Sequence, residues 1–229
     1  MPHPSFNTAQ KKAAILAGFA LLTMALLAPI AFFVVLEPIR NAGDASAQIR
    51  ALLDSGVMFR FSILIFLIVA VLDILLAWAL HRVFAPLYSQ LSLLAAWFRL
   101  IYTAVLLVAT ISLVQVLTLL QSPDSDNTFW QHLLLHEFNG FFTAFHYGLG
   151  VFGCHLVVLG YLIIRAELLP SLLGAFVVIA GLGYLMDTLF MVLAPQYDMS
   201  LASVTFIGEV LLIGWLFWWG FKQAHAPAY

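Results

Sequence analysis

Residues 57–80 read VMFRFSILIFLIVAVLDILLAWAL, an apolar run that contains only two charged side chains, Arg60 and Asp73. A helix needs about 20 residues to cross the roughly 30 Å hydrocarbon core of a bilayer, and this run is long enough. Polar and apolar residues do not alternate along it, which excludes a transmembrane β-strand. This stretch therefore predicts a membrane-spanning helix with an acid inside the bilayer.

Further apolar runs of similar length lie on both sides of this stretch. The six predicted spans are 13–36, 57–80, 92–120, about 139–164, 170–194 and 201–221. They use almost all of the chain, so we expect no separate soluble domain. The sequence predicts an all-α protein, a polytopic transmembrane bundle of six helices over residues 13–221.

The composition agrees with a membrane protein and excludes several other classes. Of the 229 residues, 64% are hydrophobic and 9% are charged, whereas a soluble domain carries about 25% charged residues. The net charge is −2 and the chain has no basic tract, so nucleic acid is not an expected partner. The single cysteine, Cys154, has no intramolecular disulfide partner, and we interpret it as a small packed side chain. The expected partners are the lipid bilayer and a small or lipophilic ligand.

The positions of Lys and Arg predict the orientation of the spans. Five basic residues flank one side of the membrane, and three lie in or beside the loop 37–56 on the other side. The first group is Lys11, Lys12, Arg82, Arg165 and Lys222, and the second is Arg40, Arg50 and Arg60. We therefore expect both termini in the cytoplasm, with residues 1–12 and 222–229 as cytoplasmic tails.

The segments between the spans predict turns and short helices. Prolines mark helix boundaries near 81–91 and 165–169, where we expect tight cytoplasmic turns. The outer loop 37–56 mixes acidic and basic residues and predicts a short helix on the membrane surface. Residues 121–138 begin with a turn and then predict an interfacial helix anchored by Trp130.

Glycines gather in the fourth and fifth predicted spans. They are Gly148, Gly150, Gly153 and Gly160 in one span and Gly174, Gly181 and Gly183 in the other. Small residues let two membrane helices approach closely, and we interpret these glycines as a packing surface rather than as an internal repeat.

Three ionisable residues lie at about the same depth in the outer half of the membrane. His146, Asp187 and Glu209 are each seven or eight residues from the outer end of a different span, a depth of about 10–12 Å. An ionisable group inside a bilayer costs at least roughly 2.5–3.5 kcal/mol, so three at one depth indicate a site. Tyr184 is one helical turn from Asp187 and shares its face.

Several interpretations of this outer cluster are open. Its three residues could act as catalytic acid and base groups. They could bind a small ligand together with Arg60 and Tyr184, or a divalent metal ion. His132 and His136, spaced i, i+4 just above, are further candidate metal ligands. The string His-x-x-x-His-Glu differs from the zinc-protease motif, in which the Glu lies between the histidines.

A second group of polar residues lies nearer the cytoplasmic side. Asp73, Arg99 and His155 are each about seven to nine residues from that end of their spans. Asp73 and Arg99 have opposite charges at matched depth on adjacent antiparallel helices, which predicts a structural ion pair. We interpret the group as a clasp between helices, with a ligand-binding role for His155 as the alternative. His146 and His155 face opposite sides of one helix, and no other span offers a histidine at either depth, so haem is not expected.

The order of these residues resembles a known family. The shared pattern comprises Phe59-Arg60, Asp73, Phe98-Arg99, the string from His155 to Asp187, Gly208-Glu209 and Trp215-Leu216. It is similar to a bacterial six-helix inner-membrane family known only under a domain-of-unknown-function label, over roughly residues 13–221. The resemblance implies a multi-pass protein of the bacterial inner membrane and implies little about activity.

The polar positions of the family pattern coincide with the two groups derived above. They correspond to Arg60, Asp73, Arg99, His155, Asp187 and Glu209. His132 and His136 do not match the pattern, so a metal site built on them would not be a common property of the family.

Three classes of function follow from these observations. The favoured class is a membrane enzyme or ligand-binding protein with a polar pocket open to the outer side. The second is a proton-coupled transporter of a small solute, in which the two polar layers form a relay. Broken helices would favour it, and Pro29 is the clear proline inside a span. The third is a structural or assembly protein whose polar residues hold helices together.

Overall fold

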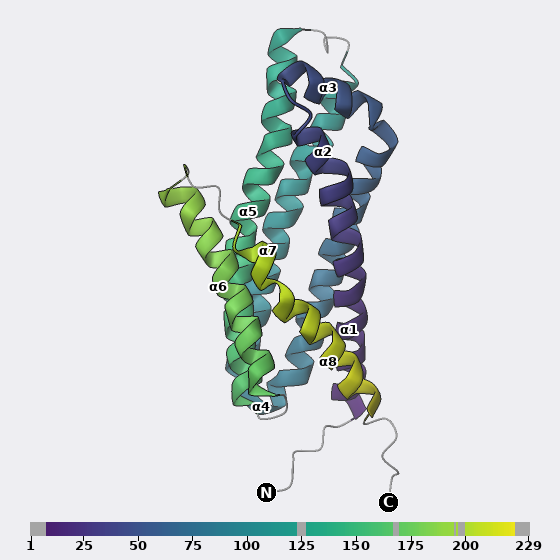
Figure 1. Cartoon of the computed structure of the whole chain (residues 1–229). Helices are drawn as coiled ribbons and strands as arrows, with labels where there is room; N and C mark the ends of the chain where they lie inside the picture. The colour runs from purple at the N-terminus through teal and green to yellow at the C-terminus, as the bar shows by residue number, and fades with distance from the viewer. Residues whose placement is uncertain (1–7, 123–126, 167–169, 195, 197–199, 223–229) are drawn as a thin grey trace, which may run out of the picture. The chain divides into compact units, whose positions relative to one another are not determined.

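The computed structural model describes residues 8–122, 127–166, 170–194, 196 and 200–222. In these ranges every regular element is a helix, as the sequence predicts (Figure 1). In chain order the elements are α1 (Thr8–Pro29), η1 (Ile30–Leu36), α2 (Glu37–Arg40), α3 (Ala45–Asp54), α4 (Gly56–Leu120), α5 (Thr128–Arg165), α6 (Ser171–Leu193), α7 (Ala202–Thr205) and α8 (Ile207–Lys222).

Five helical segments of the described chain are long and apolar enough to cross a membrane. They are Thr8–Arg40, Gly56–Leu120, Thr128–Arg165, Ser171–Leu193 and Ala202–Phe221. The chain is therefore a multi-pass membrane protein. The sequence predicts six spans, and the difference lies in α4, which contains both 57–80 and 92–120 as one element of 65 residues.

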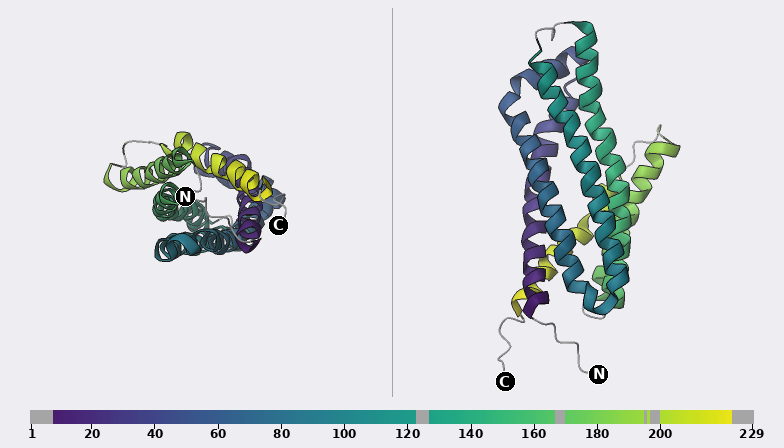
Figure 2. Two further views of the ribbon diagram at one scale, coloured as in Figure 1. Left: turned by 90° about the horizontal axis from the view of Figure 1, so that it is seen from below. Right: turned by 180° about the vertical axis from the view of Figure 1, so that it is seen from behind.

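The helix α4 reverses its direction at its centre. Tyr88 leaves the helical conformation (φ −141°, ψ 72°), two residues after Pro86. Proline removes a backbone N–H and clashes with the preceding turn, which weakens the helix at this point. Hydrogen bonds join His81 to Ser92 and Arg99 to Asp73. In each pair, one residue precedes Pro86 and the other follows it at nearly the same distance along the chain. The two arms of α4, before and after Tyr88, are therefore antiparallel (Figure 2). The tight turn predicted at 81–91 is thus present, as a kink at Tyr88 between two helical arms.

Two other segments are more continuous than the sequence predicts. Residues 128–138 form no separate interfacial helix, because α5 runs from Thr128 to Arg165 without a break. No proline interrupts this stretch, and the Asn139 side chain donates to the Leu135 carbonyl (2.8 Å) instead of ending the helix. Near the N-terminus, helical structure passes Pro29 by widening into the π-helix η1 and continues to Arg40. The predicted terminal tails lie largely outside the described residues.

The internal contacts divide the chain into two compact units, which we describe separately. Unit 1 consists of Met1–Leu22, Leu72–Tyr102 and Tyr147–Tyr229, and unit 2 consists of Thr23–Val71 and Thr103–His146. The helices α4 and α5 each contribute to both units.

In unit 1, α5 and α6 pack through glycines. A Cβ atom on Gly160 would lie 2.6 Å from the carbonyl oxygen of Gly174, and one on Gly153 would lie 2.6 Å from that of Gly181. No side chain fits at such distances, so the backbones of the two helices are in direct contact. The packing role predicted for these glycines is confirmed.

Substitution of Gly181 by alanine is expected to lower the free energy of unfolding by about 1–3 kcal/mol, the usual cost of overpacking. The new Cβ would lie 2.6 Å from the Gly153 carbonyl oxygen and 2.8 Å from the Val157 nitrogen. Gly214→Ala on α8 is the matched control, because a Cβ there meets no atom within 4 Å and alanine favours a helix. Thermal unfolding in detergent compares the two variants, and an equal loss in both would contradict the packing role.

The helix α6 also presents apolar side chains outward. On α6, Leu172, Ile179, Leu182, Leu189 and Val192 are all about half exposed or more. Side chains of this kind are expected where a helix faces lipid. Phe19 of α1 meets Phe217 of α8 edge to face, with ring centroids 4.9 Å apart.

Unit 2 has an aromatic core. Its large, fully buried side chains are Phe59 and Phe66 of α4 and Phe138, Phe141 and Phe142 of α5. The Arg40 guanidinium lies 4.5 Å from the centroid of the Phe142 ring, which holds α2 against α5.

The outer loop 37–56 forms α2 and α3, so the short helix predicted there is present. Asp44 caps α3, because its Oδ1 accepts hydrogen bonds from the Ser46 hydroxyl (2.7 Å) and the Ala47 amide (2.8 Å). These bonds, that of Ser46 first, hold the pKa of the Asp44 carboxyl below its ordinary value of 3.8. The stabilisation by this cap is therefore present above that value and is lost as the pH falls through the lowered pKa.

Candidate functional site

The polar centre of unit 1 is a buried ion pair. Asp73 on the first arm of α4 and Arg99 on the second are 1% and 3% exposed. The Asp73 Oδ1 accepts from Arg99 Nε (2.8 Å) and Nη2 (2.5 Å). The structure thus brings together the two residues for which the sequence predicts an ion pair, and it does so across the hairpin of α4.

His155 of α5 completes this group, and its tautomer follows from its partners. Its Nε2 lies 3.1 Å from Arg99 Nη1, and its Nδ1 lies 2.8 Å from the Ala95 carbonyl oxygen. A guanidinium only donates and a carbonyl only accepts, so Nε2 accepts and Nδ1 carries the hydrogen. Both ring nitrogens are occupied and the ring is neutral, which makes Asp73, Arg99 and His155 (the clasp) a closed network between α4 and α5.

Phe152 connects the clasp to a second polar group. Its ring lies 5.2 Å from the Arg99 guanidinium and stacks on His155 with centroids 5.7 Å apart. The same ring contacts Tyr102 (5.0 Å) and Tyr184 (5.4 Å). Sequence reasoning missed both Phe152 and Tyr102. The signal was their spacing, because each lies three residues, about one helical turn, from a clasp residue.

The second polar group is the pair of Tyr184 and Glu209. The Tyr184 hydroxyl on α6 donates to Glu209 Oε1 on α8 at 3.0 Å, and both side chains are partly buried. No Lys, Arg or His of the described residues forms an ion pair with this carboxyl. A carboxylate has room for about four hydrogen bonds, so Glu209 retains unused acceptor capacity.

Asp187, another predicted catalytic or metal-binding residue, has a different environment. Its Oδ1 accepts from the Leu201 amide (2.7 Å) and its Oδ2 from the Ala202 amide (2.8 Å). These amides precede and begin α7, whose first N–H groups lack partners within the helix. Asp187 therefore binds α7 to α6, and both of its oxygens are engaged in that contact.

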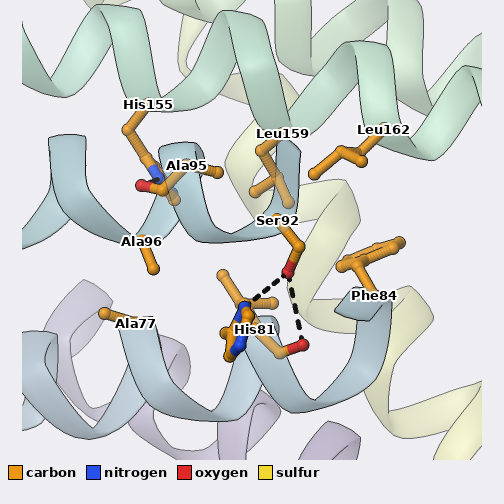
Figure 3. A pocket seen from close by; sticks show the side chains of 10 residues that line it. Ala77, His81, Phe84, Ser92, Ala95, Ala96, His155, Leu159 and Leu162 are labelled. Atoms are coloured by element: carbon orange, nitrogen blue, oxygen red, sulfur yellow. Dashed lines mark hydrogen bonds between the residues drawn. The ribbon is translucent and has the colours of Figure 1, made fainter. Parts of the chain in front are cut away.

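A small cavity lies on the other side of the clasp, within unit 1 (Figure 3). Its volume of about 10 Å³ suits about one water molecule. The lining residues are Ala77, Leu80, His81, Phe84, Ser92, Ala95, Ala96, His155, Leu159 and Leu162. His81 Nδ1 lies 2.9 Å from the Ser92 hydroxyl, which itself donates to the His81 carbonyl (3.2 Å). Sequence reasoning did not assign a role to this pair.

The other predicted site residues belong to unit 2. His146 Nδ1 lies 2.6 Å from the Phe142 carbonyl oxygen, as part of its own helix. Arg60, His132 and His136 have exposed side chains. Within the described ranges, no group of three or more His, Cys, Asp or Glu side chains is arranged to hold a metal ion. The metal role of these residues stays a prediction.

Comparison with known proteins gives a family without an assigned activity. The family model described as "Domain of unknown function (DUF4386)" matches residues 16–220. A relative from Archaeoglobus fulgidus, described as "Uncharacterized protein", is 28% identical over 156 residues, which cover 68% of this chain and 82% of the relative. The similarity thus includes an archaeal protein. No solved structure matches the chain.

Proposed function

The chain belongs to the DUF4386 family, and from this premise we propose that it is a six-span membrane protein with one proton-exchanging carboxyl, Glu209. In this proposal the carboxyl binds a small solute and exchanges a proton with it. The clasp holds the helices of unit 1 around this position and takes no part in the exchange.

The proposal rests on the Glu209 carboxyl, which forms no ion pair with a cation of the described residues. An acid within an apolar helix is costly unless it is paired, and such residues mark proton and substrate pathways. Asp73 is paired with a cation and Asp187 with two backbone amides, whereas Glu209 has only the Tyr184 hydroxyl. Of the three acids of unit 1 within described spans, Glu209 is the one whose carboxyl has a single hydroxyl group as its hydrogen-bond partner.

Thr205 supplies a second group for a bound solute. Its hydroxyl oxygen is buried and has no hydrogen-bond partner among the described residues. It lies four residues before Glu209, about one helical turn. A buried hydroxyl without a partner is costly and requires an explanation. A polar solute bound beside Glu209 would satisfy it.

The fold supports six spans with both termini in the cytoplasm. A straight helix of 65 residues would measure about 98 Å, three times the thickness of the hydrocarbon core. Its reversal at Tyr88 instead gives two arms that each suit one crossing. The excess of Lys and Arg on the side of the α4 turn favours a cytoplasmic location for that side. On this basis we place the protein in the cytoplasmic membrane, which in bacteria is the inner membrane.

Proton-coupled transport is a second candidate, favoured by the interruption before Glu209. The final span consists of α7 (Ala202–Thr205) and α8 (Ile207–Lys222). Phe206 joins them in a helical conformation (φ −59°, ψ −10°), and the Glu209 amide donates to the Phe206 carbonyl (2.9 Å) in a tighter turn. Transporters commonly place their solute sites where a membrane helix is interrupted. Enzyme and transporter share the same requirement here, an acid that changes its protonation state.

Infrared difference spectroscopy between acidic and alkaline buffer tests the proposal. We expect wild-type protein in lipid to show a band from a protonated carboxylic acid that shifts in D₂O and is absent from Glu209→Gln. Glu137→Gln, which removes a partly buried acid of unit 2, is the matched control and should retain the band. An unchanged band in Glu209→Gln would contradict the proposal.

A further inference from the structure

A larger cavity lies in unit 1 between the first turn of α1 and the end of the first arm of α4. Its volume of about 160 Å³ greatly exceeds the roughly 10–15 Å³ that one water molecule needs. It is lined by Ala9, Gln10, His81, Arg82, Ala85 and Pro86. This cavity is separate from Glu209 and from the clasp, and the proposed function does not use it.

One wall of this cavity is held in place by a hydrogen bond between helices. Gln10 is 7% exposed, and its Nε2 donates to the Val83 carbonyl oxygen at 3.0 Å. This bond fixes the start of α1 against α4. The cavity is therefore part of the packed structure of unit 1 and not a gap beside a single helix.

The polar groups of the cavity include a cation, Arg82. The Arg82 side chain is exposed and makes no hydrogen bond or ion pair with the described residues. The Ser92 hydroxyl donates to the His81 carbonyl, so the Nδ1 of His81 donates to that hydroxyl and the Nε2 of a neutral ring is an acceptor. A guanidinium presents a planar set of donors that matches a phosphate group. The remaining lining side chains, Ala9, Ala85 and Pro86, are small and apolar.

The sequence around the cavity adds positive charge. Lys11 and Lys12 follow Gln10 directly in α1. In the segments 8–12, 81–91 and 165–166 of the described chain there are four Lys and Arg residues and no acid. A group that binds here therefore meets an excess of positive charge.

We propose that this cavity binds the phosphate of an anionic phospholipid. The donors lie at the end of an apolar helical arm, where headgroups meet the hydrocarbon core, and basic cavities between helices at this level bind such headgroups. Arg82 binds the phosphate, and the apolar wall contacts the glycerol and the first methylenes. A free phosphate ion shares the charge but lacks the apolar part.

Thermal unfolding of delipidated protein in a neutral detergent tests this site. The probes are phosphatidylglycerol, phosphatidylcholine and inorganic phosphate, each added over a range of concentrations. We expect phosphatidylglycerol to raise the unfolding temperature in a saturable manner, because a ligand of the folded state stabilises it. Phosphatidylcholine and inorganic phosphate should not do so. Added salt should weaken the effect of phosphatidylglycerol.

Variants assign the effect to the cavity. Arg82→Gln should weaken the apparent affinity for phosphatidylglycerol about fivefold, the value of one basic residue near an anionic surface. Arg82→Lys retains the charge without the planar donor set and should lie between Arg82→Gln and wild type. The matched control is Arg165→Gln, because Arg165 is exposed and does not line the cavity. It lies at the same end of unit 1, where its carbonyl accepts from the Tyr88 hydroxyl.

Three results would overturn the proposal. The first is an equal stabilisation by phosphatidylcholine, which would indicate a nonspecific lipid effect. The second is an equal stabilisation by inorganic phosphate, which would indicate a free-anion site. The third is an equal loss of affinity in Arg82→Gln and Arg165→Gln, which would indicate general surface charge. None of these results bears on Glu209.

Discussion

Replacement of Arg99 by methionine is expected to lower the free energy of unfolding by about 3–5 kcal/mol, the usual cost of removing one partner of a buried ion pair. Asp73 is 1% exposed and its Oδ1 accepts two hydrogen bonds from Arg99. Without the guanidinium, a carboxyl remains buried between two helical arms with no cation beside it. The Nε2 of His155 loses its donor as well. Thermal unfolding in detergent measures the loss.

The double variant Asp73→Leu/Arg99→Met provides the control for this prediction. Replacing both members of a buried pair by apolar residues is often neutral or stabilising. We therefore expect the double variant to recover much of the stability that the single variant loses. If the double variant were less stable than Arg99→Met, the unpaired Asp73 would not be the cause of the loss, and the clasp would need another explanation.

Replacement of Asp187 by alanine is also expected to lower the free energy of unfolding. Two backbone amides donate to its carboxylate, at 2.7 and 2.8 Å, and a hydrogen bond to a charged group contributes about 1.5–3 kcal/mol. The Asp187 side chain is only partly buried. We therefore expect the two hydrogen bonds together to contribute a free energy in the lower part of that range. Faster hydrogen exchange at Leu201 and Ala202 would show the release of the start of α7.

The variant Asp187→Asn sharpens this prediction. An asparagine oxygen accepts from one amide, whereas its NH₂ group faces the other amide donor. The free energy of unfolding of Asp187→Asn should therefore lie between those of wild type and Asp187→Ala. Asp54→Ala, which removes an exposed carboxyl at the end of α3, is the control and should unfold like wild type. A wild-type exchange pattern in Asp187→Ala would contradict the role of Asp187 at α7.

The Asp73–Arg99 pair was predictable because two rules act together. Adjacent membrane helices joined by a short turn are antiparallel, so distance from the turn gives depth in the membrane. Opposite charges at one depth are then expected to pair, since an unpaired charge inside the membrane is costly. The addition of His155 also follows from depth. Its tautomer does not, because it depends on the Ala95 carbonyl of another helix.

The outer cluster was not predictable from depth alone. Depth assigns His146, Asp187 and Glu209 to one level, but it gives neither the direction of a side chain nor its partners. Asp187 is engaged with amides fourteen and fifteen residues away in the sequence, a contact that no helical periodicity indicates. His146 bonds within its own helix. Glu209 differs from both, because its carboxyl accepts a hydrogen bond from a side chain of another helix, the Tyr184 hydroxyl of α6.

Helix ends were the least predictable feature of the fold. Turn residues predicted a tight turn at 81–91, and the chain reverses there although only Tyr88 leaves the helical conformation. The polar segment 128–138 predicted a helix along the interface, yet it continues into α5. In the second case local composition suggested an interruption, while the backbone hydrogen bonds of α5 persisted because no proline breaks them. At 81–91, by contrast, Pro86 and Tyr88 mark the reversal of α4.

The most direct measurement compares the unfolding temperatures of Glu209→Gln and Asp73→Asn in one detergent. We predict that Glu209→Gln unfolds within a few degrees of wild type, because glutamine still accepts the Tyr184 hydrogen bond. Asp73→Asn should unfold about 10 °C lower, since it removes the charge that pairs with Arg99. An equal fall in both variants would contradict the division between a structural clasp and an exchangeable acid, and would make Glu209 a structural residue.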